Sequence, residues 1–154
     1  MAPAARGGQT ALEVIRFLID SSAIWRLLRE APLRAAWADV VAAGAVGSCH
    51  PQRAEFRRSA RSMDEYEAMS QMFVTQYPDV PVPKLAWAWV ESAQYRLVRD
   101  GAHRAMSPID LLICATAAYH GAVVLHDDND YAAAARPLSD VADRRIHDTP
   151  PADG

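Results

Sequence analysis

The sequence predicts an α/β fold, in which buried strands lead directly into helices. The apolar run 17–19 ends at Asp20 and continues into a segment with helical apolar spacing, which is typical of a β–α unit. A second apolar run, 122–125, ends in a group of acids. With 154 residues and 51% apolar content, the chain can form one domain with its own core. Acids at such junctions are expected to meet at the carboxyl edge of the sheet, where ligands usually bind.

The patterning of the first half of the chain divides it into alternating elements. After the first strand we expect a helix over 22–29, a helix from Pro32 to Gly44, a strand over 45–49, a helix beginning at Pro51 and a helix over 63–76. Two prolines in the segment 79–83 exclude a helix there and predict a loop or a short extended link.

The second half of the chain is predicted to alternate in the same way. We expect a helix over 84–99 that is stopped by Gly101, a buried helix from Pro108 to Gly121 with Ser107 as its N-cap, a strand over 122–125, a short helix over 131–135 and an edge strand over 137–142. The domain is therefore expected to span residues 16–142, with flexible tails at 1–12 and 147–154.

Composition and charge exclude several classes of protein. No apolar run reaches the roughly 18 residues that a membrane span requires, and the N-terminus lacks the apolar core of a signal peptide. The net charge of −3 is not that of a general nucleic-acid binder. Cys49 and Cys114 lie in separate apolar segments, which predicts two buried, reduced thiols and fits a cytoplasmic protein.

Acidic residues recur where strands end or helices begin. These positions are Asp20, Glu55, Asp110 and the group Asp127, Asp128 and Asp130. Each has an ordinary structural explanation, either as a helix cap or as a partner of the helix dipole. Together at one sheet edge, however, the carboxylates would repel one another unless a cation offset their charge. Oxygen ligands without His or Cys favour Mg²⁺ or Mn²⁺, the ions that assist phosphodiester hydrolysis.

Cationic residues near these acids could bind the phosphates of a nucleic acid. The candidates are Arg53, Arg57, Arg58 and Arg61 around Glu55, and His103 and Arg104 before the helix that carries Asp110. Lys84 is the only lysine among the 16 Lys and Arg residues, and the planar fork of arginine suits phosphate. A solvated basic face would give the same pattern.

Two other classes of protein also place aspartates at strand ends. A response-regulator receiver domain needs a lysine late in the chain, whereas Lys84 lies in the middle. A haloacid-dehalogenase-type phosphatase needs a second aspartate two residues after the first, but Asp20 is followed by Ser21 and Ser22. The sequence fits neither class.

Four segments of the chain resemble the motifs of PIN-domain ribonucleases. They are Asp20-Ser21-Ser22-Ala23, the segment Pro51-Gln-Arg-Ala-Glu55-Phe56, the helix from Ser107 to Ala117 with Asp110, and the segment from Leu125 to Tyr131 with Asp128 and Asp130. The segments follow the family's order over about residues 16–142, and the Asp110 helix is the most similar. The small size resembles the VapC toxins of type II toxin–antitoxin systems.

This resemblance implies a three-layer α/β/α sandwich with a central parallel β-sheet. It also implies a Mg²⁺-dependent endoribonuclease that cleaves structured RNA, either tRNA or rRNA, and so inhibits translation. The implied partners are a second copy of the chain in a homodimer and a cognate VapB-type antitoxin that blocks the site. A PIN fold that keeps the acids but works as a binding module, with negligible nuclease activity, stays open as an alternative.

The resemblance also assigns roles to single residues. Asp20, Glu55, Asp110 and Asp128 match the family's acidic quartet, Asp130 matches a frequent additional acid, and Ser22 matches a small hydroxyl residue near the metal. The implied Mg²⁺ ligands, which Mn²⁺ could also occupy, are Asp20, Asp110, Asp128 and Asp130, while Glu55 would ligate the ion or orient the attacking water. Asp127 matches no functional position. The chain departs from the family at Phe56-Arg57, where an aliphatic run is more common, and at Tyr131, which replaces the usual Phe and is expected to have no effect.

Overall fold

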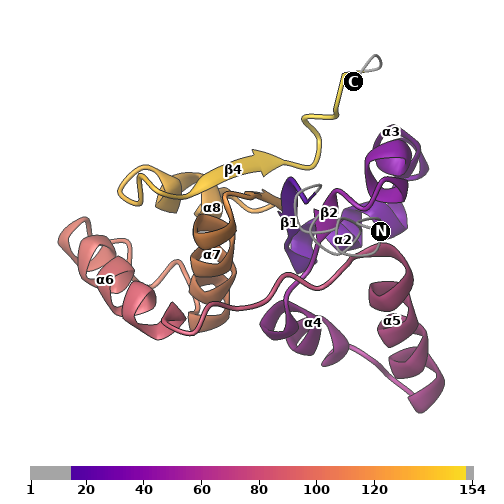
Figure 1. Cartoon of the computed structure of the whole chain (residues 1–154), viewed down its shortest axis with the longest axis horizontal. Coiled ribbons are helices and arrows are strands. Elements are labelled where there is room, and N and C mark those ends of the chain that lie inside the picture. Colours follow the sequence, from indigo (N-terminus) through magenta and orange to yellow (C-terminus); the bar gives the residue numbers. More distant parts are fainter. Residues whose placement is uncertain (1–14, 152–154) are drawn as a thin grey trace, which may run out of the picture.

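A four-stranded parallel sheet lies between two groups of helices in the computed structural model, which describes residues 15–151 (Figure 1). The strands are β1 (Phe17–Ile19), β2 (Val46–Gly47), β3 (Val123–His126) and β4 (Ala142–Arg145), in the spatial order β2-β1-β3-β4. All three pairings are parallel. Because parallel strands place their carboxyl ends at one edge, the segments that follow β1 and β3 start side by side.

The sheet is covered on both faces, as the alternation along β1 demonstrates. Phe17 and Ile19 belong to one buried cluster and Leu18 belongs to the other. Successive side chains of a strand point to opposite faces, so β1 lies in the middle layer of a three-layer sandwich. The predicted α/β/α architecture with a parallel sheet is therefore confirmed.

Two sets of helices form the outer layers of the sandwich. Phe17 and Ile19 pack with residues of α2 (Ser21–Arg29), α3 (Ala31–Ala42), α4 (His50–Arg57) and α5 (Met63–Gln76). Leu18 packs with residues of α6 (Ala86–Arg99), α7 (Pro108–His120) and α8 (Asn129–Ala135). In Figure 1, α6 and α7 lie on one side of the sheet and α2 and α3 on the other.

Local sequence signals account for most of the element boundaries. Helix α7 begins with a capping box in which Ser107 and Asp110 exchange hydrogen bonds, and it ends at Gly121, whose φ of 68° is the left-handed conformation that glycine tolerates. The predicted link over 79–83 is extended at Asp79, which bridges to Ser48. Cys49 and Cys114 are buried and free, as predicted.

The last strand differs from its prediction. The edge strand was expected over 137–142, but β4 covers Ala142–Arg145, and the preceding residues form turns around the buried side chain of Leu138. Because β4 has only one neighbouring strand, its polar side chains remain partly exposed and give no apolar signal. The domain thus extends past residue 142, and Arg144 donates to the backbone carbonyls of Asp148 and Thr149.

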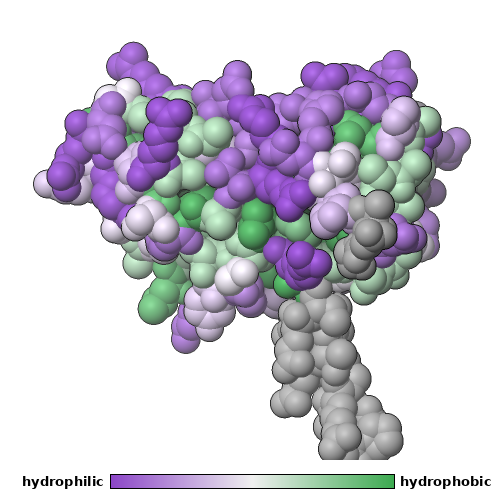
Figure 2. Space-filling model, turned by 90° about the horizontal axis from the view of Figure 1, so that it is seen from above, coloured by the Kyte–Doolittle hydropathy of each residue, from purple (hydrophilic) through white to green (hydrophobic). Residues whose placement is uncertain are grey.

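The surface mixes polar and apolar areas. On the face in Figure 2, hydrophilic side chains surround smaller hydrophobic areas. Trp87 on α6 is 61% exposed, whereas Trp89 donates its indole N–H to Asp140, so the two tryptophans have different surroundings. No helix within residues 15–151 is both long enough and apolar enough to cross a membrane.

Candidate active site

Asp20 is a buried carboxylate at the carboxyl end of β1. It is only 8% exposed, and its Oδ2 accepts hydrogen bonds from the backbone N–H and the hydroxyl of Ser22, at 3.1 and 2.7 Å. These contacts make Asp20 the N-cap of α2. Oδ1 accepts from the hydroxyl of Tyr131 instead, so the cap leaves half of the carboxylate for another role.

Asp110 lies in the first turn of α7, as the N3 residue of the capping box. Its Oδ2 accepts from the backbone N–H of Ser107 at 3.0 Å, which closes the capping box. Burial, followed by the charge of Asp20, raises the pKa of Asp110, while the hydrogen bonds from Ser107 and Tyr131 lower it. Asp20 therefore lies close enough to raise the pKa of Asp110.

The hydroxyl of Tyr131 lies between these two aspartates. Its oxygen is 2.9 Å from Oδ1 of Asp20 and 3.1 Å from Oδ1 of Asp110. Burial and the two nearby carboxylates raise the pKa of Tyr131 well above its ordinary value, so the phenol keeps its proton and donates it. This hydroxyl is the polar atom that Phe lacks, so Tyr131 adds a contact to both acids that Phe could not make. The expectation that the replacement has no effect stays a prediction.

Glu55 lies near the same pair of acids from α4. Its pKa is raised by partial desolvation first, then by the charges of Asp110 and Asp20, while Arg58 lowers it. Glu55 itself is exposed, so its carboxylate lies at the open side of the site. The structure thus brings Asp20, Glu55 and Asp110 together from three elements that are far apart in the sequence.

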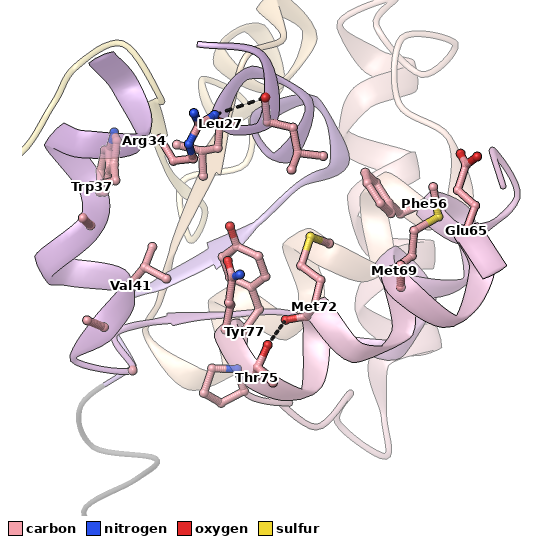
Figure 3. Close-up of a pocket in the computed structure, with 17 residues that line it drawn as sticks. Leu27, Arg34, Trp37, Val41, Phe56, Glu65, Met69, Met72, Thr75 and Tyr77 are labelled. Atoms are coloured by element: carbon pink, nitrogen blue, oxygen red, sulfur yellow. Dashed lines mark hydrogen bonds between the residues drawn. The ribbon is translucent and has the colours of Figure 1, made fainter. Parts of the chain in front are cut away.

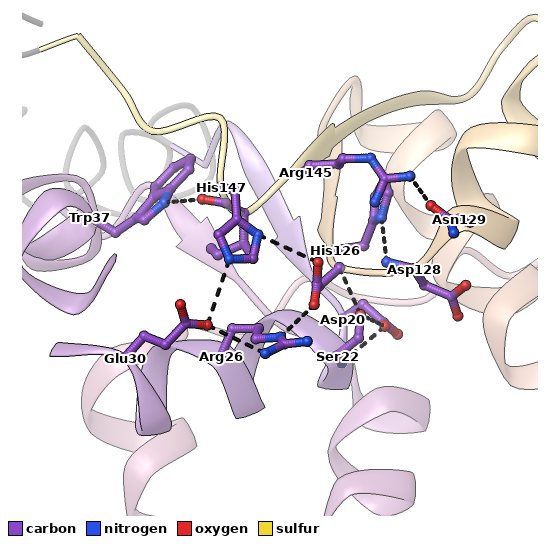
Figure 4. A network of polar contacts seen from close by, with 12 residues as sticks. Asp20, Ser22, Arg26, Glu30, Trp37, His126, Asp128, Asn129, Arg145 and His147 are labelled. Atoms are coloured by element: carbon purple, nitrogen blue, oxygen red, sulfur yellow. Dashed lines mark hydrogen bonds and ion pairs between the residues drawn. The ribbon is translucent and has the colours of Figure 1, made fainter. Parts of the chain in front are cut away.

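The acids after β3 have more local contacts. Asp128 caps α8 by accepting from the backbone N–H of Asp130 at 2.8 Å, and Asp130 is exposed. Asp127 pairs with Arg26 at 2.5 Å and donates its backbone N–H to the hydroxyl of Ser22 at 2.9 Å. These contacts hold the segment after β3 against Ser22 and Arg26 of α2, next to Asp20 (Figure 4). Asp127 is thus a structural neighbour of the site.

The donor atoms of the site fit a hard divalent cation. Within residues 15–151, no three His, Cys, Asp or Glu side chains converge into a ready ligand set. Mg²⁺ does not require one, because it commonly binds one or two carboxylates and keeps several waters. Asp20 and Asp110 supply such a pair, since one oxygen of each contacts the same hydroxyl.

The arginines predicted to contact RNA have different environments. Arg53 is buried, and its guanidinium donates to the hydroxyl of Ser48 at 2.8 Å and to the carbonyl of Tyr77 at 2.9 Å. It lies in the core and cannot bind phosphate, so that prediction is wrong. Arg57 is partly buried beside Tyr66. The remaining candidates, Arg58, Arg61, His103 and Arg104, are exposed.

Two further residues support the site and were missed in the sequence. His126 is fully buried; its Nε2 lies 2.8 Å from Asp143, and its Nδ1 accepts the backbone N–H of Asp128 at 3.0 Å. Its ring stacks on that of Tyr131 with centroids 5.1 Å apart. The partner acid comes from the edge strand, whose position the sequence did not predict, so no local signal links the two.

A family model described as the PIN domain matches residues 17–137. The chain belongs to the PIN domain family. Ribonuclease VapC6 of Mycobacterium tuberculosis is 63% identical over 102 residues, which cover 66% of this chain and 80% of VapC6. Ribonuclease VapC21 of the same species is 30% identical over 116 residues, covering 75% of this chain and 83% of VapC21.

Solved structures share the same PIN-domain fold. VapBC2 from Rickettsia felis, bound to a promoter DNA fragment, aligns with a TM-score of 0.68 and 9% identity over 85% of this chain and 98% of that chain. VapBC-1 from nontypeable Haemophilus influenzae aligns with a TM-score of 0.69 and 13% identity over 86% and 99%. At these identities the likeness is one of fold.

Proposed function

We propose that this PIN-domain protein is a VapC-type toxin, a Mg²⁺-dependent endoribonuclease that cleaves structured RNA, either tRNA or rRNA, and thereby inhibits translation. The observation that carries the proposal is that the carboxylates of Asp20 and Asp110 both contact the buried hydroxyl of Tyr131, while Glu55 lies at the open side of the site. The names of the relatives, ribonucleases VapC6 and VapC21, agree with this chemistry.

The acids have separate roles in the proposed hydrolysis. Asp20 and Asp110 would hold Mg²⁺, or Mn²⁺ in its place, with Asp128 and Asp130 as further ligands on the same edge. When bound, the ion offsets charge on the scissile phosphate and lowers the pKa of water. Glu55 would ligate the ion or orient and deprotonate the attacking water, a task that its raised pKa favours. Water would attack phosphorus directly as the scissile P–O bond breaks and the ribose oxygen leaves and takes up a proton, with no covalent intermediate on the protein.

Exposed cations beside the acids would hold the RNA backbone. Arg58 is exposed on the same helix as Glu55, and its charge lowers the pKa of that glutamate. Arg104 is exposed just before α7. Contacts of this kind bind phosphate without reading bases, so they support binding to RNA but leave its identity to other parts of the surface.

Cleavage by an Asp20→Asn variant tests the proposed function. The amide oxygen can still accept from Ser22, so the fold should persist, while the loss of a charged ligand should lower the cleavage rate on the order of 100-fold or more. Total RNA and a tRNA pool are incubated with wild type and variant, with Mg²⁺ and with EDTA, and products are resolved on gels. Discrete products that need both Mg²⁺ and Asp20 are expected.

A matched control uses Asp127→Asn, which neutralises a neighbouring acid that has no proposed role in the chemistry. This variant should keep cleavage within a few-fold of wild type. The absence of cleavage by folded, metal-loaded wild type, free of antitoxin, would contradict the nuclease proposal and favour a PIN-fold binding module with negligible nuclease activity.

An antitoxin is the partner that we propose for an apolar groove on the α3 side of the molecule. The groove encloses about 740 Å³ between α3 and α5. Trp37 and Val41 line one side and Met72 and Tyr77 the other (Figure 3). VapBC structures from other bacteria are among those that share the fold. A VapB-type helix with an apolar face would fit such a groove.

The groove reaches the helix that carries Glu55. Phe56, the next residue on α4, lines the groove and packs against Phe73. A chain seated there would therefore lie beside the helix that carries Glu55. A homodimer is proposed as well, with the exposed apolar residues Trp87, Tyr95 and Val98 on one side of α6 as the surface.

A further inference from the structure

Tyr131 is the one neutral side chain that contacts both central acids among the hydrogen bonds within residues 15–151. It is 1% exposed, and its hydroxyl donates toward the carboxylates of Asp20, which follows β1, and of Asp110 on α7. The proposed hydrolysis assigns this hydroxyl no step. Its position therefore needs a separate explanation.

Each of the two carboxylates is held at both of its oxygens. Oδ2 of Asp20 accepts from Ser22, and Oδ2 of Asp110 accepts from the backbone N–H of Ser107. The two Oδ1 atoms meet the Tyr131 hydroxyl instead. The single proton of the phenol is shared between these two acceptors, so each carboxylate has a contact at both oxygens, which restricts its rotation about the Cβ–Cγ bond.

The phenol ring is itself held in place. It stacks on His126, whose Nε2 contacts Asp143 of β4 and whose Nδ1 accepts the backbone N–H of Asp128. The ring belongs to the buried cluster that also includes Leu111 and Cys114 of α7. The position of the hydroxyl is therefore fixed by the packing of the ring against the sheet and α7.

We propose that Tyr131 is a positioning residue, whose hydroxyl sets the orientation and separation of the Asp20 and Asp110 carboxylates so that they capture a divalent cation. This role rests on the proposed metal-dependent function. A donor between two like charges keeps both acids in a geometry that they would otherwise leave by repulsion. The binding of the cation then requires less rearrangement of the protein.

Titration of Mn²⁺ alone, by isothermal calorimetry, tests the role without RNA. Tyr131→Phe removes only the hydroxyl and keeps the ring that packs on His126. The dissociation constant for Mn²⁺ should rise about fivefold, the effect expected for one net hydrogen bond. Tyr119→Phe is the control, because Tyr119 is exposed at the C-terminal end of α7, whereas Asp110 lies in the first turn of that helix. It should bind Mn²⁺ as wild type does.

RNA cleavage gives a second reading of the same variant. The Mg²⁺ concentration for half-maximal rate should rise about fivefold in Tyr131→Phe, while the rate at saturating Mg²⁺ stays within about twofold. A residue that merely stabilised the fold would lower the melting temperature without moving either metal titration. Unchanged or tighter Mn²⁺ binding by Tyr131→Phe would overturn the inference.

The outcome with wild type separates this inference from the proposed function. No Mn²⁺ binding by folded wild type overturns the metal-dependent function together with the role of Tyr131. Binding by wild type that Tyr131→Phe leaves unchanged overturns the role of Tyr131 alone. A crystal structure of metal-free wild type tests the inference without a variant. The Tyr131 hydroxyl is expected within hydrogen-bond distance of both carboxylates, and a carboxylate that is rotated away from it contradicts the inference.

Discussion

At the scale of single residues, the central acids have structural and proposed catalytic roles at once. Asp20 caps α2 and Asp110 closes the capping box of α7, yet one oxygen of each remains directed to Tyr131. The helix-cap and site interpretations of these acids are therefore compatible. Substitution by Asn, which can still accept a cap hydrogen bond, separates the two roles better than substitution by Ala.

The raised pKa of Glu55 predicts a pH-dependent stability. In the folded protein this group binds its proton more tightly than in the unfolded chain, where its pKa is about 4.5. The contribution of Glu55 to stability therefore falls as pH rises from 4.5 through the raised pKa, and Glu55→Gln removes this loss. The melting temperature of the metal-free variant, relative to wild type, should increase over that interval and then level off.

Thermal melts between pH 4 and 8 (buffers chosen at roughly half-unit steps) measure this difference. Asp110→Asn should behave in the same direction, because burial raises the pKa of Asp110 as well. A difference between variant and wild type that stays constant with pH would show that neither desolvation nor the charges of Asp110 and Asp20 raise the pKa of Glu55.

Tyr131 was the residue whose role the sequence could not predict. Its contact with Asp20 spans 111 positions, and nothing local distinguishes this tyrosine from a core aromatic residue. The acids themselves were predictable, because each follows an apolar run or opens a helix. Local patterns thus identify which groups reach the sheet edge, while tertiary packing decides which of them touch.

At the scale of elements, α4 carries arginines with opposite environments. Arg53 is buried with hydrogen bonds to Ser48 and Tyr77, and Arg58 is exposed near Glu55. The sequence grouped them as one basic surface, because charge alone does not show which side of a short helix faces the core. Buried arginines are uncommon and require partners that only the fold supplies.

The two arginines should respond differently to substitution. Arg53→Met leaves a buried hydroxyl and a carbonyl without their donor, and should lower the free energy of unfolding by about 2–4 kcal/mol. Arg58→Ala should change it by less than about 0.5 kcal/mol but weaken RNA binding and flatten its salt dependence. Urea melts measure the change in stability. Fluorescence anisotropy measures RNA binding, with both the parent and the Arg58→Ala protein carrying Asp20→Asn so that the RNA is not cleaved.

Equal RNA affinities of the Arg58→Ala and parent proteins across the salt series would exclude Arg58 from the RNA surface. Normal stability of Arg53→Met would mean that the contacts of Arg53 contribute little.

The strands show where element prediction from the sequence succeeds. Strands β1 and β3 are buried on both faces and have continuous apolar runs, which the sequence reveals. Strand β4 is an edge strand of sequence Ala-Asp-Arg-Arg, and its pairing with β3 depends on the backbone rather than on apolar side chains. That is why its position was misjudged by several residues.

At the scale of the whole molecule, the groove and the acid site are separate surfaces joined by α4. The groove residues come from the α3 side, whereas Asp110 and Tyr131 come from the α7 side. A substitution in the groove can therefore weaken the binding of a partner without changing the acids. Ala68 is exposed on α5 and lines the groove, which makes it a suitable position.

Ala68→Arg should lower affinity for the cognate antitoxin by at least about tenfold, since a charge would replace apolar contact. RNA cleavage by the free variant should equal that of wild type. Ala36→Arg, at an exposed position on α3 that does not line the groove, is the control and should bind normally. Surface plasmon resonance with immobilised antitoxin measures the affinity of both variants. Normal binding by Ala68→Arg would mean that the antitoxin binds another face of the molecule.

The strand order also determines when during synthesis the acids can meet. Strand β1 is made first but lies in the middle of the sheet, and its partner β3, together with Asp110 and Tyr131, comes from the last third of the chain. The contact of α3 with the end of the domain also forms late, because Trp37 donates to the carbonyl of Ile146. Contacts this distant form slowly and only after the intervening chain exists. A ribosome translating this protein therefore completes nearly all of it before the nascent chain can assemble an RNA-cleaving centre.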